Sequence, residues 1–255
     1  MISHRIAGHT AIITIDNPPA NTWTPEDLRA FQELVGSLDA DRGIYAAVVT
    51  GAGEKFFSAG ADLKSFHRDK VLARHFIACF GAAFEALMGA RFVTIAAING
   101  YAMGGGLECT LCCDIRVAEE HAQMALPEPG VGLLPAGSGT QNLPWLVGEG
   151  WAKRMILTNE RVDAATALRI GLVQEVVPKG AALAFATKLA ERVAALSPRA
   201  VEYCKGLIHN ARNGVPHRAG LSLERERFMD LFDHGDQDEG VSAFLEKRKP
   251  EWKND

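Results

Sequence analysis

Two glycine-containing segments combine residue types that suit the binding of a developing negative charge. Residues 57–63 place small side chains on both sides of Gly60 and then Asp62. Residues 99–108 carry three consecutive glycines, Gly104 to Gly106, directly after an apolar run. The first amide groups of a helix have no partner inside that helix, so glycines at a helix start leave N–H donors open to an anion or oxyanion. Taken alone, such a glycine run is more often a site of tight packing.

Two glutamates stand in apolar surroundings near these segments. Glu108 follows Gly104 by four residues in a helix-compatible run, and Glu128 lies between two prolines in the otherwise uncharged stretch 123–134. A carboxyl group in apolar company either finds a partner or has a pKa above its ordinary value. Because a separation of twenty residues does not define a distance, two interpretations stay open. The glutamates form an acid–base pair, or both are solvated or ion-paired.

Other sites of chemistry are poorly supported. The glycines do not follow the G-x-G-x-x-G order of a dinucleotide site, and neither a phosphate-binding G-x-x-x-x-G-K-[ST] loop nor a G-x-S-x-G elbow occurs. The odd number of cysteines favours reduced thiols. No second pair completes a zinc pattern with Cys109, Cys112 and Cys113, so we expect packing on a buried helix and no metal site.

The composition is that of a folded protein. The chain has 255 residues, 27 basic against 31 acidic, with a net charge of −4. The mild acidity argues against a nucleic-acid partner. Residues 1–5 lack the layout of a signal peptide, and the uncharged run 92–107 is too short to cross a bilayer. We therefore expect a cytoplasmic protein without a membrane or nucleic-acid partner.

Strand and helix patterns alternate along most of the chain, which favours an α/β fold. A helix is predicted from Pro25, where Thr24 can act as the cap, and a second over 70–89. From residue 181 the pattern is helical, and Pro198 and Pro216 divide it into about three helices. We expect a core over residues 1–195 and a helical region over 196–255. Buried strands are predicted at 11–15, 45–50, 92–98, 114–118 and 172–177.

Several motifs together resemble the crotonase (enoyl-CoA hydratase/isomerase) superfamily, and within it an enoyl-CoA hydratase. The resemblance covers nearly the whole chain. It implies β-β-α units wound into a spiral, a C-terminal helical region used for trimerisation, and a homotrimer or a hexamer of two trimers. It also implies an acyl-CoA thioester substrate and no cofactor, since coenzyme A is part of that substrate. The matching segments are 57–64, 97–108, 126–135, 139–141, 161–177 and 244–248.

The resemblance also assigns roles to individual residues. The amides of Ala61 and Gly105 would form an oxyanion hole, and Glu108 and Glu128 match the two glutamates of hydratases. Glu108 would activate water and Glu128 would deliver a proton to C2. The residues expected to contact the substrate or its CoA part are Asn21, Ala59, Asp62, Leu63, Lys64, Tyr101, Phe244 and Lys247.

Three alternatives remain beside an ordinary 2-enoyl-CoA hydratase. An enoyl-CoA isomerase can work with one carboxylate, and hydratases of branched, aromatic or sulfur-containing enoyl-CoAs share the same acids. A non-catalytic acyl-CoA-binding or RNA-binding relative is the alternative from a different class. The acyl pocket is expected to be shaped by Met103, Leu107 and the segment 66–84.

Overall fold

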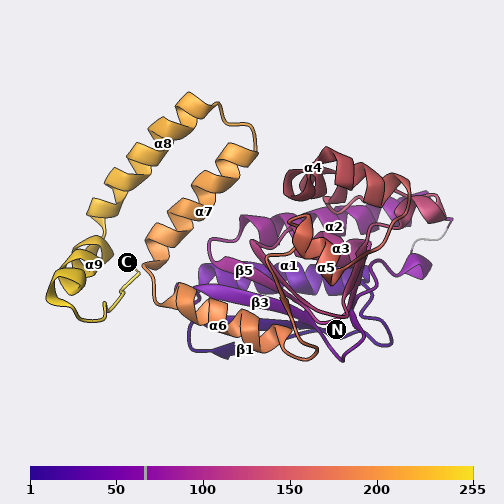
Figure 1. Cartoon of the computed structure of the whole chain (residues 1–255), viewed down its shortest axis with the longest axis horizontal. Coiled ribbons are helices and arrows are strands. Elements are labelled where there is room, and N and C mark those ends of the chain that lie inside the picture. Colours follow the sequence, from indigo (N-terminus) through magenta and orange to yellow (C-terminus); the bar gives the residue numbers. More distant parts are fainter. Residues whose placement is uncertain (66–67, 255) are drawn as a thin grey trace.

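The computed structural model describes residues 1–65 and 68–254, and it contains two β-sheets wrapped by helices (Figure 1). Every neighbouring pair of strands is parallel except β1–β2 and β8–β9. The larger sheet has the order β1 (Ile2–Ala7), β2 (Thr10–Ile15), β3 (Ala46–Gly51), β5 (Val93–Ile98), β7 (Ile115–Glu119), β10 (Glu175–Val177). The smaller sheet has the order β4 (Phe56–Ser58), β6 (Tyr101–Met103), β8 (Gln123–Ala125), β9 (Val162–Asp163).

The chain winds through these sheets in repeated β-β-α units. Each unit places its first strand in the larger sheet and its second in the smaller sheet, and a helix follows. The expected α/β spiral is therefore confirmed. The successive units are β3-β4-α2 (Lys70–Gly89), β5-β6-α3 (Gly105–Leu111) and β7-β8-α4 (Gly139–Leu157).

Local signals placed the longer elements well. Helix α1 (Pro25–Ala40) begins at the predicted proline, and the Thr24 side chain accepts a hydrogen bond from the Asp27 amide at 3.1 Å. Strand β10 starts at Glu175, three residues later than predicted, because Leu172 and Val173 are buried in the core outside the strand ladder. The smaller sheet was not predicted, since strands of two or three residues are too short to show a pattern.

Helix α6 (Ala182–Ala194) covers one face of the larger sheet. Its alanines at 182, 186 and 190 are one helical turn apart and pack on β-branched side chains of the strands, including Val48 and Ile95. A second, larger cluster fills the space between the sheets and helices α1, α2 and α3, and this cluster reaches the segments that follow β4 and β6.

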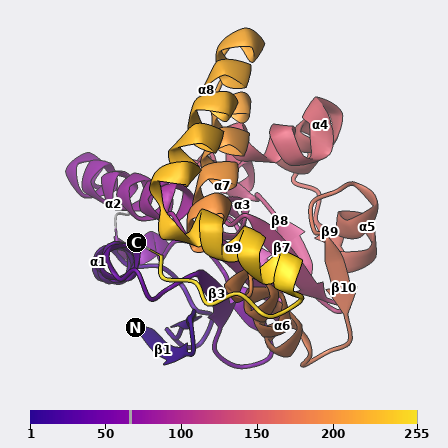
Figure 2. The same ribbon diagram turned by 90° about the vertical axis from the view of Figure 1, so that its left-hand side faces the viewer.

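The C-terminal region consists of α7 (Pro198–Arg212), α8 (His217–Asp230) and α9 (Gly235–Glu246). Pro198 and Pro216 mark the starts of α7 and α8 as predicted. The prediction of about three helices after residue 181 was one too few among the described residues, because the break before α9 contains no proline. Helices α7 and α8 lie side by side and extend away from the sheets (Figures 1 and 2).

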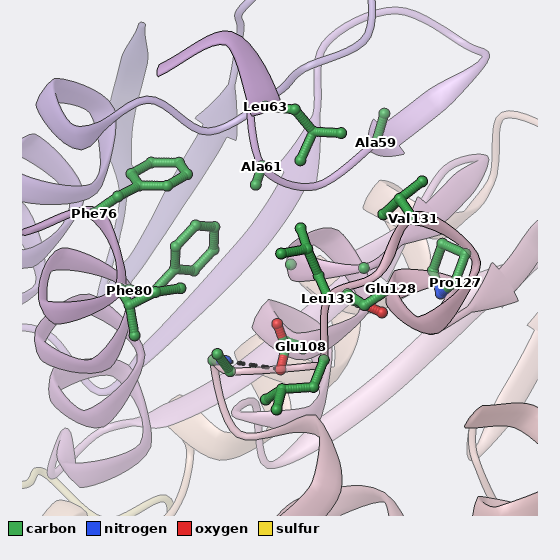
Figure 3. Close-up of a pocket in the computed structure, with 16 residues that line it drawn as sticks. Ala59, Ala61, Leu63, Phe76, Phe80, Glu108, Pro127, Glu128, Val131 and Leu133 are labelled. Carbon is green, nitrogen blue, oxygen red and sulfur yellow. Dashed lines mark hydrogen bonds between the residues drawn. The ribbon is translucent and has the colours of Figure 1, made fainter. Parts of the chain in front are cut away.

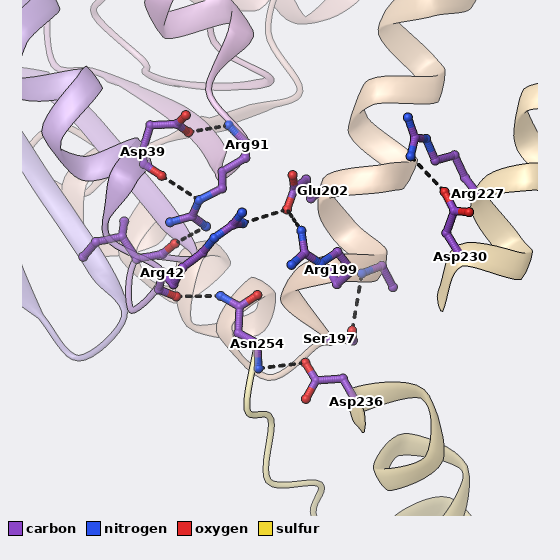
Figure 4. A network of polar contacts seen from close by, with 12 residues as sticks. Asp39, Arg42, Arg91, Ser197, Arg199, Glu202, Arg227, Asp230, Asp236 and Asn254 are labelled. Carbon is purple, nitrogen blue, oxygen red and sulfur yellow. Dashed lines mark hydrogen bonds and ion pairs between the residues drawn. The ribbon is translucent and has the colours of Figure 1, made fainter. Parts of the chain in front are cut away.

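Polar contacts tie this region back to the core (Figure 4). Glu202 on α7 forms an ion pair with Arg42, which follows α1, at 3.2 Å. Near the C-terminus, the Asn254 side chain donates to the Arg42 carbonyl at 2.6 Å, and the main-chain N–H of Asn254 donates to the Asp236 carboxylate on α9. The boundary near residue 195 and the use of this region in trimerisation stay predictions.

Helix α2 is long and apolar enough to meet the length and composition criteria for a membrane span. Core helices of folded proteins meet the same criteria. Here α2 packs against α1, and Phe76, Phe80 and Phe84 form a chain of edge-to-face ring contacts inside the core. We therefore interpret α2 as a core helix.

Candidate active site

The two sequence motifs meet because the turns before β4 and β6 are tied together. The Asn99 side chain accepts from the Gly51 amide at 3.1 Å and donates to the carbonyls of Gly51 and Gly53 at 2.9 and 2.8 Å. Strands β4 and β6 then pair in parallel, so their carboxyl ends lie at the same edge of the smaller sheet. The segments that follow them, 59–63 and 104–108, therefore lie next to each other.

The amides of Ala61 and Gly105 are neighbours, as predicted for an oxyanion hole. The Trp23 amide donates to the Gly60 carbonyl at 2.8 Å, and the Trp23 carbonyl accepts from the Asp62 amide at 2.9 Å. Because these bonds lie on one side of the segment, the N–H of Ala61 points to the other side. Gly60 has φ +91°, and a Cβ atom there would lie 2.7 Å from the Met103 carbonyl oxygen. The Ala61 nitrogen is 3.7 Å from where a Gly105 Cβ would stand. Gly105 is the first residue of α3, so its N–H has no partner within the helix.

Glu108 lies in α3 with its carboxyl group held by two main-chain amides. Its Oε1 accepts hydrogen bonds from Gly137 and Gly139, each at 2.8 Å, and Figure 3 draws the first of these bonds. Gly139 begins α4, so the carboxylate stands at the positive end of that helix. Burial raises the pKa of Glu108 from 4.5 to about 7; the two amides counteract this rise and the nearby Glu128 adds to it.

Glu128 approaches the glycine run from the other side. It begins a short 3₁₀ turn, and its Oε1 is 2.9 Å from the position of a Cβ on Gly104. Its Oε2 is buried and has no hydrogen-bond partner among the described residues. Burial raises the pKa of this carboxyl group as well. A buried carboxyl oxygen without a partner is costly unless a ligand or proton occupies it.

Both carboxyl groups and both amides line one pocket of about 750 Å³, its open mouth included. In Figure 3 the rings of Phe76 and Phe80 form one side, and Leu63 lies across from Glu108. Most of the lining is apolar. The lining residues are Ala59, Ala61, Leu63, Phe76, Ile77, Phe80, Gly104, Gly105, Glu108, Pro127, Glu128, Val131, Leu133, Leu134, Ala136 and Gly137.

Four other residues predicted to contact substrate do not line this pocket. The Asp62 carboxylate accepts from the Lys64 amide at 3.1 Å, and the Lys64 side chain is exposed. Tyr101 packs against Phe56 at a ring distance of 5.5 Å. The Asn21 side chain is buried and donates to the carbonyl of Ala52, which follows β3, and to the carbonyl of Phe56, the first residue of β4. The geometry gives Asn21, Asp62 and Tyr101 structural contacts, while their predicted roles toward CoA stay predictions.

Phe244 and Lys247 lie far from the pocket within one chain. Phe244 is 81% exposed on α9, and Lys247 is the residue that ends that helix. In Figure 1, α9 lies at one end of the molecule, away from the sheets and from α2. Their predicted contact with CoA therefore needs a second subunit, and it stays a prediction.

The expectation for the acyl pocket was partly wrong. Leu107 is fully buried in the core, and neither Leu107 nor Met103 lines the pocket. The segment 66–84 does contribute Phe76, Ile77 and Phe80, whereas Phe66 lies outside the described residues. Sequence reasoning also missed the amides of residues 137 and 139. The only signal was the glycine density around 130–139, which indicated a close backbone approach without naming its partner.

The cysteine-rich stretch has the packing role expected of it. Cys109, Cys112 and Cys113 are buried free thiols, and burial raises the pKa of each. Among the described residues, no group of three or more His, Cys, Asp or Glu side chains is placed to hold a metal ion.

Comparison with known proteins identifies the family of this chain. The enoyl-CoA hydratase/isomerase family matches residues 5–255. The chain belongs to this family. It is 37% identical to the short-chain-enoyl-CoA hydratase of Clostridium acetobutylicum over 246 residues, which cover 96% of this chain and 94% of that protein.

The fold of this chain also matches solved structures closely. Pseudomonas aeruginosa DspI is 61% identical, with a TM-score of 0.97 over 99% of this chain and 96% of that chain. An enoyl-CoA hydratase from Bacillus anthracis is 35% identical, with a TM-score of 0.96 over 100% of this chain and 99% of that chain. The crotonase fold and the hydratase class expected from the sequence are therefore confirmed.

The raised pKa of Glu108 has a consequence for stability. A carboxyl group whose pKa is higher in the folded than in the unfolded chain stabilises the fold below the unfolded value, here 4.5, and this contribution is lost as the pH rises through about 7. The shift corresponds to about 3 kcal/mol. E108Q cannot ionise at this position. We therefore expect the free energy of unfolding of E108Q, relative to that of the native chain, to be higher at pH 8 than at pH 5. Urea unfolding at both pH values measures the difference, and an equal difference at pH 5 and pH 8 would contradict the burial of this charge.

Proposed function

We propose that the chain adds water to a 2-enoyl-CoA thioester to give a 3-hydroxyacyl-CoA, using the amides of Ala61 and Gly105 and the carboxyl groups of Glu108 and Glu128. The observation that carries this proposal is the convergence of two neighbouring main-chain amides and two carboxyl groups on one pocket. No cofactor is part of the proposal, because coenzyme A enters with the substrate.

The two amides act on the thioester oxygen. As the water oxygen adds to C3, electrons move toward the thioester and an enolate oxygen develops negative charge. Two fixed N–H donors stabilise this charge without reorganising, because the backbone already holds them in place. Small residues at 60–61 and 104–105 leave room for the thioester in the proposed complex. A Cβ on Gly105 would also stand 2.6 Å from the Phe80 ring, which lines the same pocket.

The two glutamates handle the water and the proton. The amide bonds to Oε1 hold Glu108 in one orientation and leave Oε2 without a partner among the described residues, so it can accept a hydrogen bond from the attacking water. Glu108 takes the proton of this water as it adds to C3, and Glu128 gives a proton to C2. Burial raises the pKa of both groups, so each carboxylate accepts a proton more readily than a solvated glutamate does.

The lining favours an apolar acyl group. Leu63, Phe76, Val131 and Leu133 supply aliphatic and aromatic surface, and no lysine or arginine is among the described residues that line the pocket. An acyl chain ending in a carboxylate would meet the two glutamates without a compensating cation. We propose an apolar acyl chain without a terminal charge, in the breakdown of fatty acids or related acyl-CoA compounds.

Recognition of CoA and assembly complete the proposal. Lys64 is exposed and follows the pocket residue Leu63 in the chain, and we propose that it contacts a CoA phosphate. Phe244 and Lys247 would reach CoA from a neighbouring subunit in a homotrimer or a hexamer. The exposed apolar side chains of the C-terminal helices, among them Phe228 and Phe232, support such an assembly. We place the enzyme in the cytoplasm, without a nucleic-acid or membrane partner.

A direct assay tests this function. The purified chain is mixed with crotonyl-CoA, loss of the enoyl thioester absorbance is followed, and the product is identified as 3-hydroxybutyryl-CoA. A panel of longer, branched and dicarboxylic 2-enoyl-CoAs then tests the apolar acyl group, and a 3-enoyl-CoA tests isomerisation. Acyl-CoA binding without turnover of any member would overturn the proposal in favour of a non-catalytic relative.

A further inference from the structure

Ser138 stands between the two amides that hold Glu108, in a conformation that serine rarely adopts. Its φ is +108° and its ψ is −6°, a region that favours glycine. It is the N-cap of α4, yet its side chain makes no capping hydrogen bond. Serine at this position normally takes an extended backbone and bonds an amide of the first helical turn. Another interaction must therefore hold Ser138 in place.

The Ser138 hydroxyl is anchored behind the active site. Its Oγ lies 3.1 Å from the Cys112 Sγ and accepts a hydrogen bond from the Asn142 side-chain amide at 3.1 Å. Burial raises the pKa of Cys112 to about 12, so this group is a neutral thiol. Asn142 is itself buried, at 3% exposure, one turn further along α4. The anchor thus joins α3, which carries Glu108, to the first turn of α4.

Arg212 fixes the direction of Asn142. A guanidinium group only donates hydrogen bonds, and Arg212 Nη2 donates to the Asn142 Oδ1. The amide nitrogen of Asn142 must then face the other way, toward the Ser138 hydroxyl. Arg212 is the last residue of α7, the first helix of the C-terminal region. A continuous set of contacts therefore runs from α7 to the amides that hold the Glu108 carboxylate.

We propose that Arg212, Asn142 and Ser138 are positioning residues that hold the Gly137 and Gly139 amides on Glu108. None of the three lines the pocket that contains the two glutamates. Their effect on the reaction passes through the conformation of residue 138, so the reactive carboxylate depends on α7 being docked. This inference rests on the proposed role of Glu108 in hydration.

Loss of this support is expected to slow the reaction and to raise the pKa of Glu108. The charged and titratable groups that face it are Glu128, the neutral thiol of Cys112, which caps the end of α3, and, beyond that thiol, Arg212. The two amides lower the pKa of Glu108. Weakening them raises that pKa, so a smaller fraction of Glu108 is ionised at neutral pH.

A double-mutant cycle distinguishes positioning from ordinary packing. Glycine adopts φ +108° without strain, whereas alanine keeps the strain and lacks the anchor. We therefore expect S138A to lower kcat for crotonyl-CoA by about ten- to hundredfold, and S138G to lose less. N142A is expected to cost about tenfold in the native background but less than about twofold when combined with S138G. KM should change little in all of these variants.

Further variants and readouts separate the possible outcomes. R212A should resemble N142A, R212K should recover part of the loss, and R218A, which removes an exposed arginine of α8, is the matched control. The profile of kcat against pH should shift to higher pH in N142A but not in R218A. Circular dichroism verifies that each variant is folded. Equal losses from N142A in the native background and in the S138G background would overturn the positioning role while leaving hydration intact. An inactive native enzyme would instead overturn the proposed function.

Discussion

Glutamine at position 108 or at position 128 lowers kcat for crotonyl-CoA hydration by about 10²–10⁴-fold, the usual contribution of a positioned acid or base. Each substitution keeps the size of the side chain and removes its ability to carry a proton. In E108Q the side-chain oxygen can still accept from the Gly137 and Gly139 amides, so the pocket keeps its shape. Stopped-flow or steady-state loss of enoyl absorbance measures the effect.

The two glutamine variants also test whether the carboxyl groups act together. If the transfer of the water proton to Glu108 and the transfer of the Glu128 proton to C2 occur in one concerted step, the double variant should be little slower than the slower single variant. Glu33 is an exposed glutamate on α1, and E33Q serves as the control for loss of one carboxylate. Binding of 3-hydroxybutyryl-CoA by calorimetry should persist in both active-site variants. Near-native turnover by E108Q or E128Q would refute a mechanism that needs two acids.

Features with local causes could be predicted from the sequence. Thr24 and Pro25 marked the start of α1 because capping depends on neighbouring residues alone. The glycine run indicated a helix start with open amides, and α3 begins at Gly105. The resemblance of whole motifs to the crotonase superfamily predicted contacts between distant residues, which local rules cannot predict. It placed Ala61 and Glu128 beside Gly105 and Glu108, and the structure brings all four to one pocket.

Features that depend on distant segments could not be predicted in this way. The amides that hold Glu108 come from residues 29 and 31 positions further along the chain, and no local pattern links them. Tyr101 and Leu107 have side chains suited to a ligand pocket, but strand and helix direction turn them toward Phe56 and the core. Ser138 resembles an ordinary helix cap until its φ of +108° is known.

Proline at position 105 is expected to remove one oxyanion donor and little else from the backbone. Gly105 is the first residue of α3, where a proline is tolerated because its N–H has no partner in the helix. The added side-chain atoms do cause a clash, since a Cβ there would lie 2.6 Å from the Phe80 ring. G105A carries the same Cβ and keeps the N–H, so it is the matched control for the clash.

The difference between the two variants then measures the replacement of the Gly105 N–H by a proline Cδ, which removes the donor and takes its place. We expect kcat/KM of G105P to fall about 10²–10³-fold below that of G105A, as for the loss of one oxyanion-hole donor in other enzymes. Adding F80L to both variants makes room for the ring-facing Cβ and should leave the ratio unchanged. The loss should lie mainly in kcat, because the enolate charge exists only in the transition state. Equal kcat/KM values for G105P and G105A would show that the Gly105 amide does not contact the developing charge, and the thioester oxygen would then have to lie elsewhere in the pocket.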